Sequence, residues 1–335
     1  MIVKTPEARQ ADDEILDTSL RPGLWQDFIG QEKLKSSLGV IMEAAKMRGE
    51  SLEHLLFYGN SGLGKTSLAL VLANEMGVPL HRTSGPALQI AGDVASVLTN
   101  LEDRAILFID EIHRVPKQVV ETLYSAMEDF KLHLVLGRGP MARTMELPLP
   151  PFTIIGATTK VGLLPNPFRN RFGAIFHIDF YEEKAIEDIL RRSARILGVA
   201  IDEEALGILA KRSRFTPRVA NRILKRVRDF SLVRAKDVVT KEVALEALSF
   251  LEIDELGLDL EDRKILEALI KKFSGGPVGI EPLAAAVQEE EDTLLDLYEP
   301  FLTQIGFLER TSRGRIATRK AYEHMGIVKT QKDLL

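Results

Sequence analysis

The eight residues from Gly59 to Thr66 read Gly-Asn-Ser-Gly-Leu-Gly-Lys-Thr and match the pattern G-x-x-x-x-G-K-[ST]. An apolar run, residues 55–58, precedes them, and a helical pattern, residues 66–76, follows. In such a strand-to-helix turn the glycines let backbone N–H groups point at one phosphate, and the positive end of the helix adds attraction. Lys65 would place its charge on the β- and γ-phosphate oxygens, and the Thr66 hydroxyl would bind Mg²⁺. The stretch therefore predicts an ATP site; a glycine-rich turn that binds nothing is the alternative.

Short apolar runs alternate with helical patterns from Leu55 to Phe180. Such alternation is typical of a parallel sheet with helices on both faces, which is an α/β fold. The expected strands are residues 55–58, 80–83, 105–109, 152–157 and 175–180, and the expected helices are residues 66–76, 94–101 and 117–127.

Two acidic residues, Asp110 and Glu111, follow the apolar strand 105–109. Ligands of open parallel sheets bind at the carboxyl ends of the strands, so these carboxylates are predicted to lie beside the phosphate loop. Asp110 would hold Mg²⁺ and Glu111 would orient and polarise the attacking water. By itself such a pair is more often a solvated strand end, but the phosphate loop favours the functional interpretation.

Three further side chains are candidates for contact with the γ-phosphate. Thr159 follows the strand 152–157, and Arg171 lies with Arg169 on a proline-stiffened segment. Arg218 is the last residue of Thr216-Pro-Arg, where Thr216 is the expected N-cap of a helix. An arginine that reaches a neighbouring subunit's γ-phosphate is worth ~10³ to 10⁵ in rate. Ordinary strand threonines and solvated arginines are the alternatives.

Composition excludes several classes of protein. The chain has 335 residues, a formal net charge of −5 and no cysteine, so disulfides, thiolate zinc sites and cysteine nucleophiles are ruled out. No apolar run approaches the ~20 residues needed to span a bilayer, and the first 20 residues are acidic, which predicts a cytoplasmic protein. With an acidic chain, any contact with DNA requires a local basic cluster.

The hydrophobic pattern of the sequence changes at Tyr181, where helical patterns follow one another without strands between them. Three more helices and a strand-turn-strand pattern after Asp259 predict a winged helix. The expected organisation is an N-terminal arm at residues 1–20, an ATPase domain at 21–181 with a β-hairpin insert at 131–149, a small helical lid at 182–256, a winged helix at 257–325 and a flexible tail at 326–335.

The basic cluster lies on the predicted ribbon of the winged helix, between Glu309 and Lys320. Arg310, Arg313 and Arg315, without interleaved aromatic residues, fit contact with backbone phosphates and no reading of bases. The preceding helix is acidic and would repel phosphate. A merely solvated ribbon is the alternative.

Taken together, these motifs resemble the AAA+ ATPases and, within them, the bacterial RuvB family of Holliday-junction branch-migration motors. The resemblance covers about residues 15–325. The residues that carry it are Leu20-Arg-Pro, Asp27-Phe-Ile-Gly-Gln-Glu, Gly62-Leu-Gly-Lys-Thr, Thr83-Ser-Gly-Pro, Leu107-Phe-Ile-Asp-Glu-Ile-His, residues 124–130, Gly156-Ala-Thr-Thr, Arg169-Asn-Arg-Phe-Gly, Gly276-Pro-Val-Gly, Tyr298-Glu-Pro and residues 310–318.

The resemblance implies a hexameric ring on double-stranded DNA and four-way junctions, with ATP and Mg²⁺ as cofactors. It implies that Arg171 acts in trans, that Arg218 is a sensor in cis and that Thr159 is the first sensor. The nucleotide pocket would comprise Leu20, Arg21, Ile29, Gly62, Leu63, Gly64, Lys65, Thr66, Ser67 and Tyr181, with Glu128, Asp129 and Phe130 at the subunit interface.

The insert is expected to dock on a RuvA-type junction-binding protein, and a junction resolvase is a further expected partner. Its docking face would carry Leu132, Leu134, Leu136, Met145 and Leu147, although two core strands are an alternative.

Other functions remain open from the residues alone: a clamp loader, a protein remodeller, or an ATP-switched DNA-binding regulator with little turnover. The sequence also departs from the family pattern. Asn60-Ser61 replaces two prolines, and Phe215 replaces a glycine before Thr216. If that position requires a positive φ, the angle of the lid is in question.

Overall fold

The structure is a computed structural model that describes residues 19–136, 143–234 and 236–327. It divides into two compact units that meet between Phe180 and Tyr181, and each is described by itself. Within the described ranges, no helix is long and apolar enough to cross a membrane. The expected arm lies outside them up to residue 18, as does the tail from residue 328.

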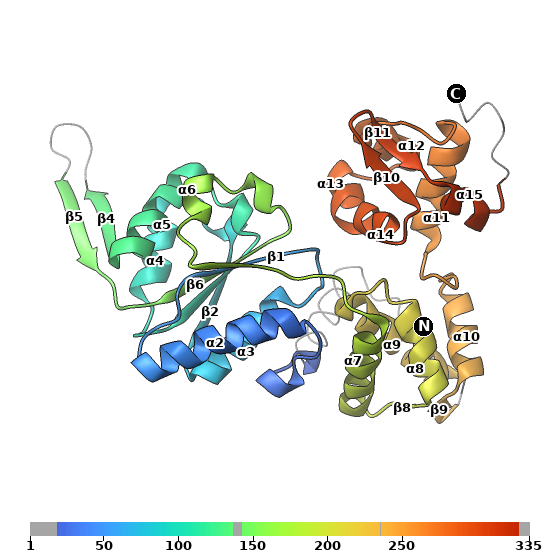
Figure 1. Cartoon of the computed structure of the whole chain (residues 1–335), viewed down its shortest axis with the longest axis horizontal. Coiled ribbons are helices and arrows are strands. Elements are labelled where there is room, and N and C mark those ends of the chain that lie inside the picture. Colours follow the sequence, from blue (N-terminus) through green and yellow to red (C-terminus); the bar gives the residue numbers. More distant parts are fainter. Residues whose placement is uncertain (1–18, 137–142, 235, 328–335) are drawn as a thin grey trace. The chain divides into compact units, whose positions relative to one another are not determined.

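A five-stranded parallel sheet forms the centre of the first unit (Figure 1). Its order is β2-β3-β6-β1-β7. The strands are β1 (Leu55–Tyr58), β2 (Leu80–Ser84), β3 (Ile106–Asp110), β6 (Thr153–Thr158) and β7 (Ala174–His177). Every residue of β6 is buried, as expected for a central strand covered on both faces. The α/β prediction and its five strands are therefore confirmed.

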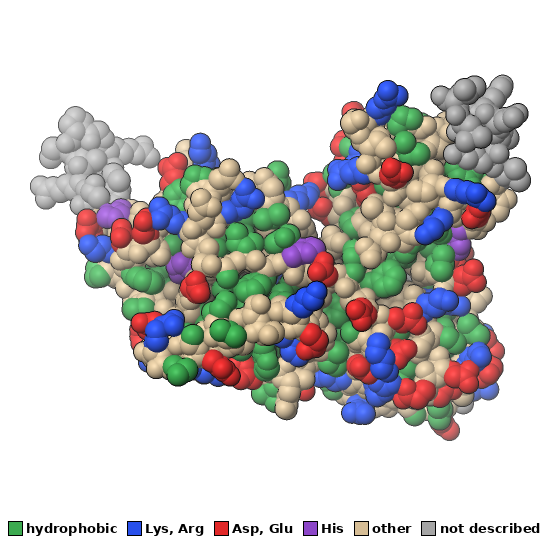
Figure 2. Space-filling model, viewed as in Figure 1, with side chains coloured by type: hydrophobic (Ala, Val, Ile, Leu, Met, Phe, Trp, Pro, Cys, Tyr) green, Lys and Arg blue, Asp and Glu red, His purple; other side chains and the backbone are tan. Residues whose placement is uncertain are grey.

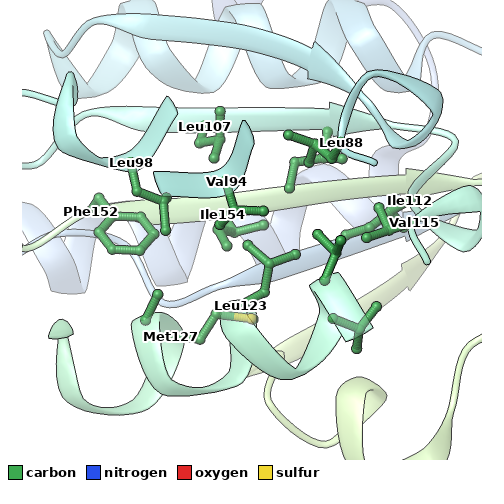
Figure 3. Close-up of a cluster of buried hydrophobic side chains, with 14 of the residues drawn as sticks. Leu88, Val94, Leu98, Leu107, Ile112, Val115, Leu123, Met127, Phe152 and Ile154 are labelled. Carbon is green, nitrogen blue, oxygen red and sulfur yellow. The ribbon is translucent and has the colours of Figure 1, made fainter. Parts of the chain in front are cut away.

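Helices cover both faces of this sheet. In Figure 1, α2 (Glu32–Arg48) and α3 (Lys65–Met76) lie on one side, and α4 (Ala91–Thr99) and α5 (Lys117–Asp129) on the other. Figure 3 shows the apolar side chains of α4 and α5 packed against residues of β3 and β6, including Leu107 and Ile154. The sequence prediction missed α2, although its buried Leu34, Leu38, Met42 and Ala45 follow helical spacing.

The insert forms a separate antiparallel hairpin. Strand β4 (Lys131–Leu136) pairs with β5 (Arg143–Pro148), so the alternative of two core strands is wrong. The register sets Leu132 opposite Leu147 and Leu134 opposite Met145. Directly opposed residues share one face of a ladder. Residues 137–142 lie outside the described part.

The second unit begins with the expected helical lid. Its helices are α7 (Glu183–Leu197), α8 (Glu203–Lys211), α9 (Pro217–Val233) and α10 (Lys241–Phe250), joined by the short parallel strands β8 (Ala200–Ile201) and β9 (Val238–Val239). Sequence reasoning missed α10 and the β8–β9 pair.

The winged helix follows in the same unit, and its prediction is confirmed. Helices α11 (Leu260–Glu267), α12 (Ile280–Val287), α13 (Glu291–Thr293) and α14 (Glu299–Gln304) precede the ribbon of β10 (Leu308–Thr311) and β11 (Gly314–Ala317). A final helix, α15 (Arg319–His324), was not predicted. Leu266, Leu269 and Leu302 lie in a separate apolar core of this region.

Candidate nucleotide and DNA sites

The phosphate loop leaves β1 and enters α3 through three glycines in left-handed conformations. Gly59, Gly62 and Gly64 have φ values of 146°, 79° and 98°. A Cβ atom on Gly59 would lie 2.4 Å from the carbonyl oxygen of Ile178, so no other residue fits there without displacing the backbone. The Asn60-Ser61 variation lies between these positions and leaves the left-handed geometry in place.

The Lys65 side chain is buried within the loop that it follows. Its Nζ donates hydrogen bonds to the carbonyl oxygens of Gly59 at 2.7 Å and Asn60 at 2.8 Å. Phosphate oxygens are charged acceptors and form stronger bonds with an ammonium group than neutral carbonyls do. A nucleotide would therefore offer Lys65 better partners than the loop does. Leu63 is also buried, so it would meet the nucleotide through its backbone.

Asp110 and Glu111 emerge at the same edge of the sheet as the phosphate loop. Both β3 and β1 pair in parallel with β6 between them, which aligns their carboxyl ends. Asp110 Oδ1 accepts from the backbone N–H of Glu111 at 2.9 Å. Glu111 has a left-handed φ of 47°, and its carboxylate accepts from Arg114 at 2.9 Å. The two acids therefore differ: one continues the strand, and the other turns away from it.

Gly85 fixes the strained turn at Glu111. A Cβ on Gly85 would lie 2.3 Å from the Glu111 carbonyl oxygen, so the segment after β2 packs directly on this backbone. A non-glycine residue in left-handed conformation costs of order 1–3 kcal/mol and persists only where its surroundings enforce it. This close approach gives a physical role to the Thr83-Ser-Gly-Pro motif.

Two adjacent threonines at the end of β6 differ in their surroundings. The buried Thr158 makes a 2.9 Å hydrogen bond with His113 Nδ1 and accepts from the N–H of Lys160. Thr159, the predicted sensor, is half-buried beyond the strand. Sequence reasoning missed the Thr158–His113 contact, which ties β6 to the segment after Glu111.

Arg171 and Glu128 form an ion pair at 2.5 Å, with both side chains partly exposed. The buried His54 holds both segments: its Nε2 donates to the Met127 carbonyl oxygen at 3.1 Å, and its own carbonyl accepts from Gly173 at 2.9 Å. His54 Nδ1 accepts from a backbone N–H of β6, which requires a neutral ring. Burial lowers the pKa of His54 and favours that form. His54 is therefore a positioning residue that the sequence did not reveal.

The other predicted pocket residues are distributed over both units. Asp129 is exposed, whereas Phe130 packs its ring edge-on against Phe152, with the centroids 5.6 Å apart. Leu20 is buried, and Arg21 and Ile29 are half-buried in the first unit. Tyr181 and Arg218 belong to the second unit, so their placement against the loop stays a prediction.

The start of α9 has the predicted N-cap residue and first-turn proline. Thr216 occupies the N-cap position, but its hydroxyl donates to the Arg214 carbonyl at 2.9 Å and does not cap the helix. Phe215 does adopt the positive φ that a glycine would favour, at 55°, and Arg214 before it has a φ of 52°. The predicted N-cap position of Thr216 is therefore confirmed, but its side chain forms no capping bond to the helix. Exposed Arg218 follows in the first turn.

The ribbon corrects one predicted DNA contact. Arg310 and Arg313 are exposed, but Arg315 is buried, and its Nε and Nη2 donate to Glu299 Oε2 at 3.1 and 3.0 Å. Arg310 also approaches Glu299 Oε1, at 3.3 Å. Glu299 does not face solvent as a repelling charge, because these arginines neutralise it. On the face drawn in Figure 2, acidic and basic side chains are interspersed, so a local basic feature is still required for DNA.

Fewer residues of the hairpin are accessible for docking than the sequence predicted. Leu132 is fully buried in the core under α5, and Leu147 packs against the same cluster. A partner cannot reach Leu132, so that prediction is wrong for this structure. Met145 is 42% exposed. The side chains of Leu134 and Leu136 lie outside the described part.

Within the described residues, no cluster of three or more His, Asp or Glu side chains could hold a metal by itself. A Mg²⁺ bound with ATP does not need one, because it keeps several waters and is held by one or two carboxylates and the phosphates. Thr66, in the first turn of α3, and Asp110, at the end of β3, offer the oxygen donors that this mode requires.

A glycine-rich loop between β1 and α3, an acidic end on β3, a helical lid and a winged helix together define an AAA+ P-loop ATPase. Three family models match the chain in order: the Holliday junction DNA helicase RuvB P-loop domain over residues 20–178, the RuvB AAA lid domain over 181–254 and the RuvB C-terminal winged helix domain over 255–326. The chain belongs to the RuvB family.

Individual relatives agree with this assignment. The chain is 58% identical to the Holliday junction branch migration complex subunit RuvB of Dehalococcoides mccartyi, over 94% of this chain and 90% of the relative. It is 55% identical to that of Chloroflexus aurantiacus, over 97% and 93%. A solved structure, the Thermotoga maritima RuvB Holliday junction branch migration motor, matches with a TM-score of 0.85 and 48% identity, over 92% of this chain and 99% of that chain.

Substitutions of the two ribbon arginines, Arg313 and Arg315, should cause different defects, the first in DNA binding and the second in stability. Arg313→Ala should weaken duplex binding evenly across sequences and lower the slope of log affinity against log salt by about 1, because it removes one phosphate contact. Arg315→Ala should instead destabilise the protein by up to about 3–5 kcal/mol, because it leaves the buried Glu299 with only the exposed Arg310 as an ion-pair partner. Salt-dependent DNA titration and thermal unfolding measure the two effects.

The matched control is Arg315→Met combined with Glu299→Leu, which removes both charges and should recover most of the lost stability. If Arg315→Ala unfolds like the parent chain yet binds DNA more weakly, Arg315 contacts DNA after all.

Proposed function

We propose that this chain is an ATP-driven motor that moves four-way DNA junctions by branch migration in recombination and repair. The observation that carries the proposal is the alignment of Lys65 with Asp110 and Glu111 at one sheet edge, in a chain that also has a winged helix with exposed arginines. The names of the relatives support the junction as substrate.

Hydrolysis requires three local rearrangements. Lys65 exchanges the Gly59 and Asn60 carbonyls for β- and γ-phosphate oxygens. Thr66 and Asp110 would hold the Mg²⁺ that accompanies the nucleotide, and the ion would neutralise charge on the phosphates. Glu111 leaves Arg114 and polarises the attacking water. An exposed ion pair contributes about 0–1 kcal/mol, so the Glu111–Arg114 pair is only a small barrier to this change.

Arg171 completes the site of a neighbouring subunit in a hexameric ring. Its present partner, Glu128, belongs to the segment implied in the subunit interface, so the pair keeps Arg171 extended at that surface. Thr159 and Arg218 sense the γ-phosphate within one chain, with Leu20, Arg21, Ile29 and Tyr181 around the adenine. These roles rest on the family resemblance and on the exposure of Arg171 and Arg218.

The hairpin docks on a RuvA-type junction-binding protein through its predicted apolar face, of which Met145 is exposed. Leu132 and Leu147 pack against the apolar core that includes residues of α5, which anchors the base of the hairpin. Arg310 and Arg313 hold DNA by its phosphates, which suits a motor that must move along any sequence. The protein works in the cytoplasm, and a junction resolvase is a further partner.

A synthetic four-way junction with a central homologous region tests the function. With Mg·ATP and a RuvA-type partner, the chain should convert the junction into two duplexes, and Lys65→Ala should not. Lys33→Ala, on an exposed side chain of α2, is the matched control and should retain activity. Turnover of a few ATP per minute or less, unaffected by DNA and without migration, would instead identify an ATP-switched DNA-binding regulator.

Mixed rings test whether Arg171 acts in trans. Arg171→Ala and Lys65→Ala chains should each be inactive alone, and mixing them should restore part of the ATPase activity, because some interfaces combine an intact Arg171 with an intact Lys65. Steady-state hydrolysis is measured after exchange of subunits is verified by mass. Verified mixed rings that show no recovery would place Arg171 in its own chain's site.

A further inference from the structure

Arg214 lies in the lid but is bound by the winged helix. Its guanidinium reaches Asp259 and Asp262 at 2.5 Å each, and its Nε donates to the Gly257 carbonyl at 3.0 Å. The Phe301 ring lies 4.9 Å from its Cζ atom. Asp259 and Asp262 form the capping box of α11, so Arg214 fastens the lid to the start of the first helix of the winged helix.

Phe215 provides the apolar half of this connection. Its side chain packs against the core of the winged helix, while its carbonyl accepts from the N–H of Tyr181 at 2.9 Å, at the entrance to the lid. A glycine would adopt the positive φ of 55° at less cost but would lose the packing. Phenylalanine in place of the family's glycine therefore makes the positive φ less favourable but adds apolar packing against the winged helix.

The connection lies within one helical turn of the proposed γ-phosphate sensor. Arg214 and Phe215 come immediately before α9, and Arg218 lies in its first turn. A second bond, from His324 of α15 to Asp254 at 2.8 Å, joins the last helix of the winged helix to the segment after α10. The winged helix is therefore attached to the lid through two different elements, α11 and α15.

We propose that Arg214 and Phe215 are positioning residues that make the start of α9 and the winged helix move as one body, so that a nucleotide-dependent shift of Arg218 displaces bound DNA. The proposal rests on the motor function above. It assigns to this chain a stiff lid–winged-helix connection in place of a flexible linker.

The absence of cysteine allows a direct test in the 335-residue chain. Arg222→Cys on α9 and Glu281→Cys on α12 place fluorescent labels on exposed positions of the lid and the winged helix. Single-molecule energy transfer should give one narrow population that is the same with ATP, with ADP and without nucleotide. A broad or nucleotide-dependent distribution in this otherwise unaltered chain would overturn the proposal, whether or not the chain migrates junctions.

Variants then test whether stiffness matters for coupling. Arg214→Gln should broaden the energy-transfer distribution and lower DNA stimulation of ATP hydrolysis at least tenfold, while basal hydrolysis and duplex affinity change by less than about twofold. Burial raises the pKa of Asp262 to about 7, so proton uptake can offset the lost guanidinium and the variant should fold. Arg195→Gln, on an exposed side chain of α7, is the matched control and should change neither property.

A merely structural role would reduce basal and stimulated hydrolysis in equal proportion. That result, or full DNA stimulation in a chain with a broadened distribution, would refute coupling through Arg214. Phe215→Gly provides a second variant that keeps the charges; it should also broaden the distribution and lower DNA stimulation.

Discussion

The contact between Gly59 and the Ile178 carbonyl oxygen sets the geometry of the nucleotide site. A Cβ on residue 59 would lie 2.4 Å from that oxygen, so only a glycine, here with a φ of 146°, fits where the chain leaves β1. The loop can then curl back so that its N–H groups and the start of α3 face one anion. Because β3 and β1 flank β6, the same edge receives Asp110 and the Thr158-Thr159 end. The order of the strands and the close approach of Gly59 to Ile178 therefore bring the phosphate loop and the acidic residues to one edge of the sheet.

The charged side chains of the nucleotide site and of the winged helix differ in how easily they can exchange their present partners. Lys65 rests on two carbonyls, Glu111 on Arg114, and Arg171 on Glu128. The two ion pairs are partly exposed and contribute about 0–1 kcal/mol each, so a phosphate or a neighbouring subunit can displace them. Arg315 and Glu299 are buried, and separating them costs up to about 3–5 kcal/mol. The easily displaced contacts suit side chains that must change partners during catalysis. The buried Arg315–Glu299 pair suits a role in stabilising the winged helix.

The sequence predicted the features that depend on local pattern. The sheet, the phosphate loop, the acidic strand end, the hairpin and the winged helix all follow from periodicity and glycine positions. It could not predict side-chain partners across the fold: Arg315 looked like a surface charge because Glu299 is 16 residues away, and alternation alone could not show that Leu132 faces the core. His54 gave no signal, since an isolated histidine beside a strand is not distinctive. Phe215 was noticed as a departure, but its packing required the structure.

Equilibrium binding of Mg·ATP to Lys65→Ala tests the central claim, that this loop holds the nucleotide which drives the protein. Calorimetry on the unaltered chain should detect binding, and the variant should lose affinity at least about 100-fold, which corresponds to about 2.7 kcal/mol. The variant should keep the unfolding temperature and the duplex affinity of the parent chain, because the two loop carbonyl oxygens that bond the Lys65 ammonium can bond water instead. Unchanged ATP affinity in such a folded variant would contradict the assignment of the phosphate loop and the mechanism built on it.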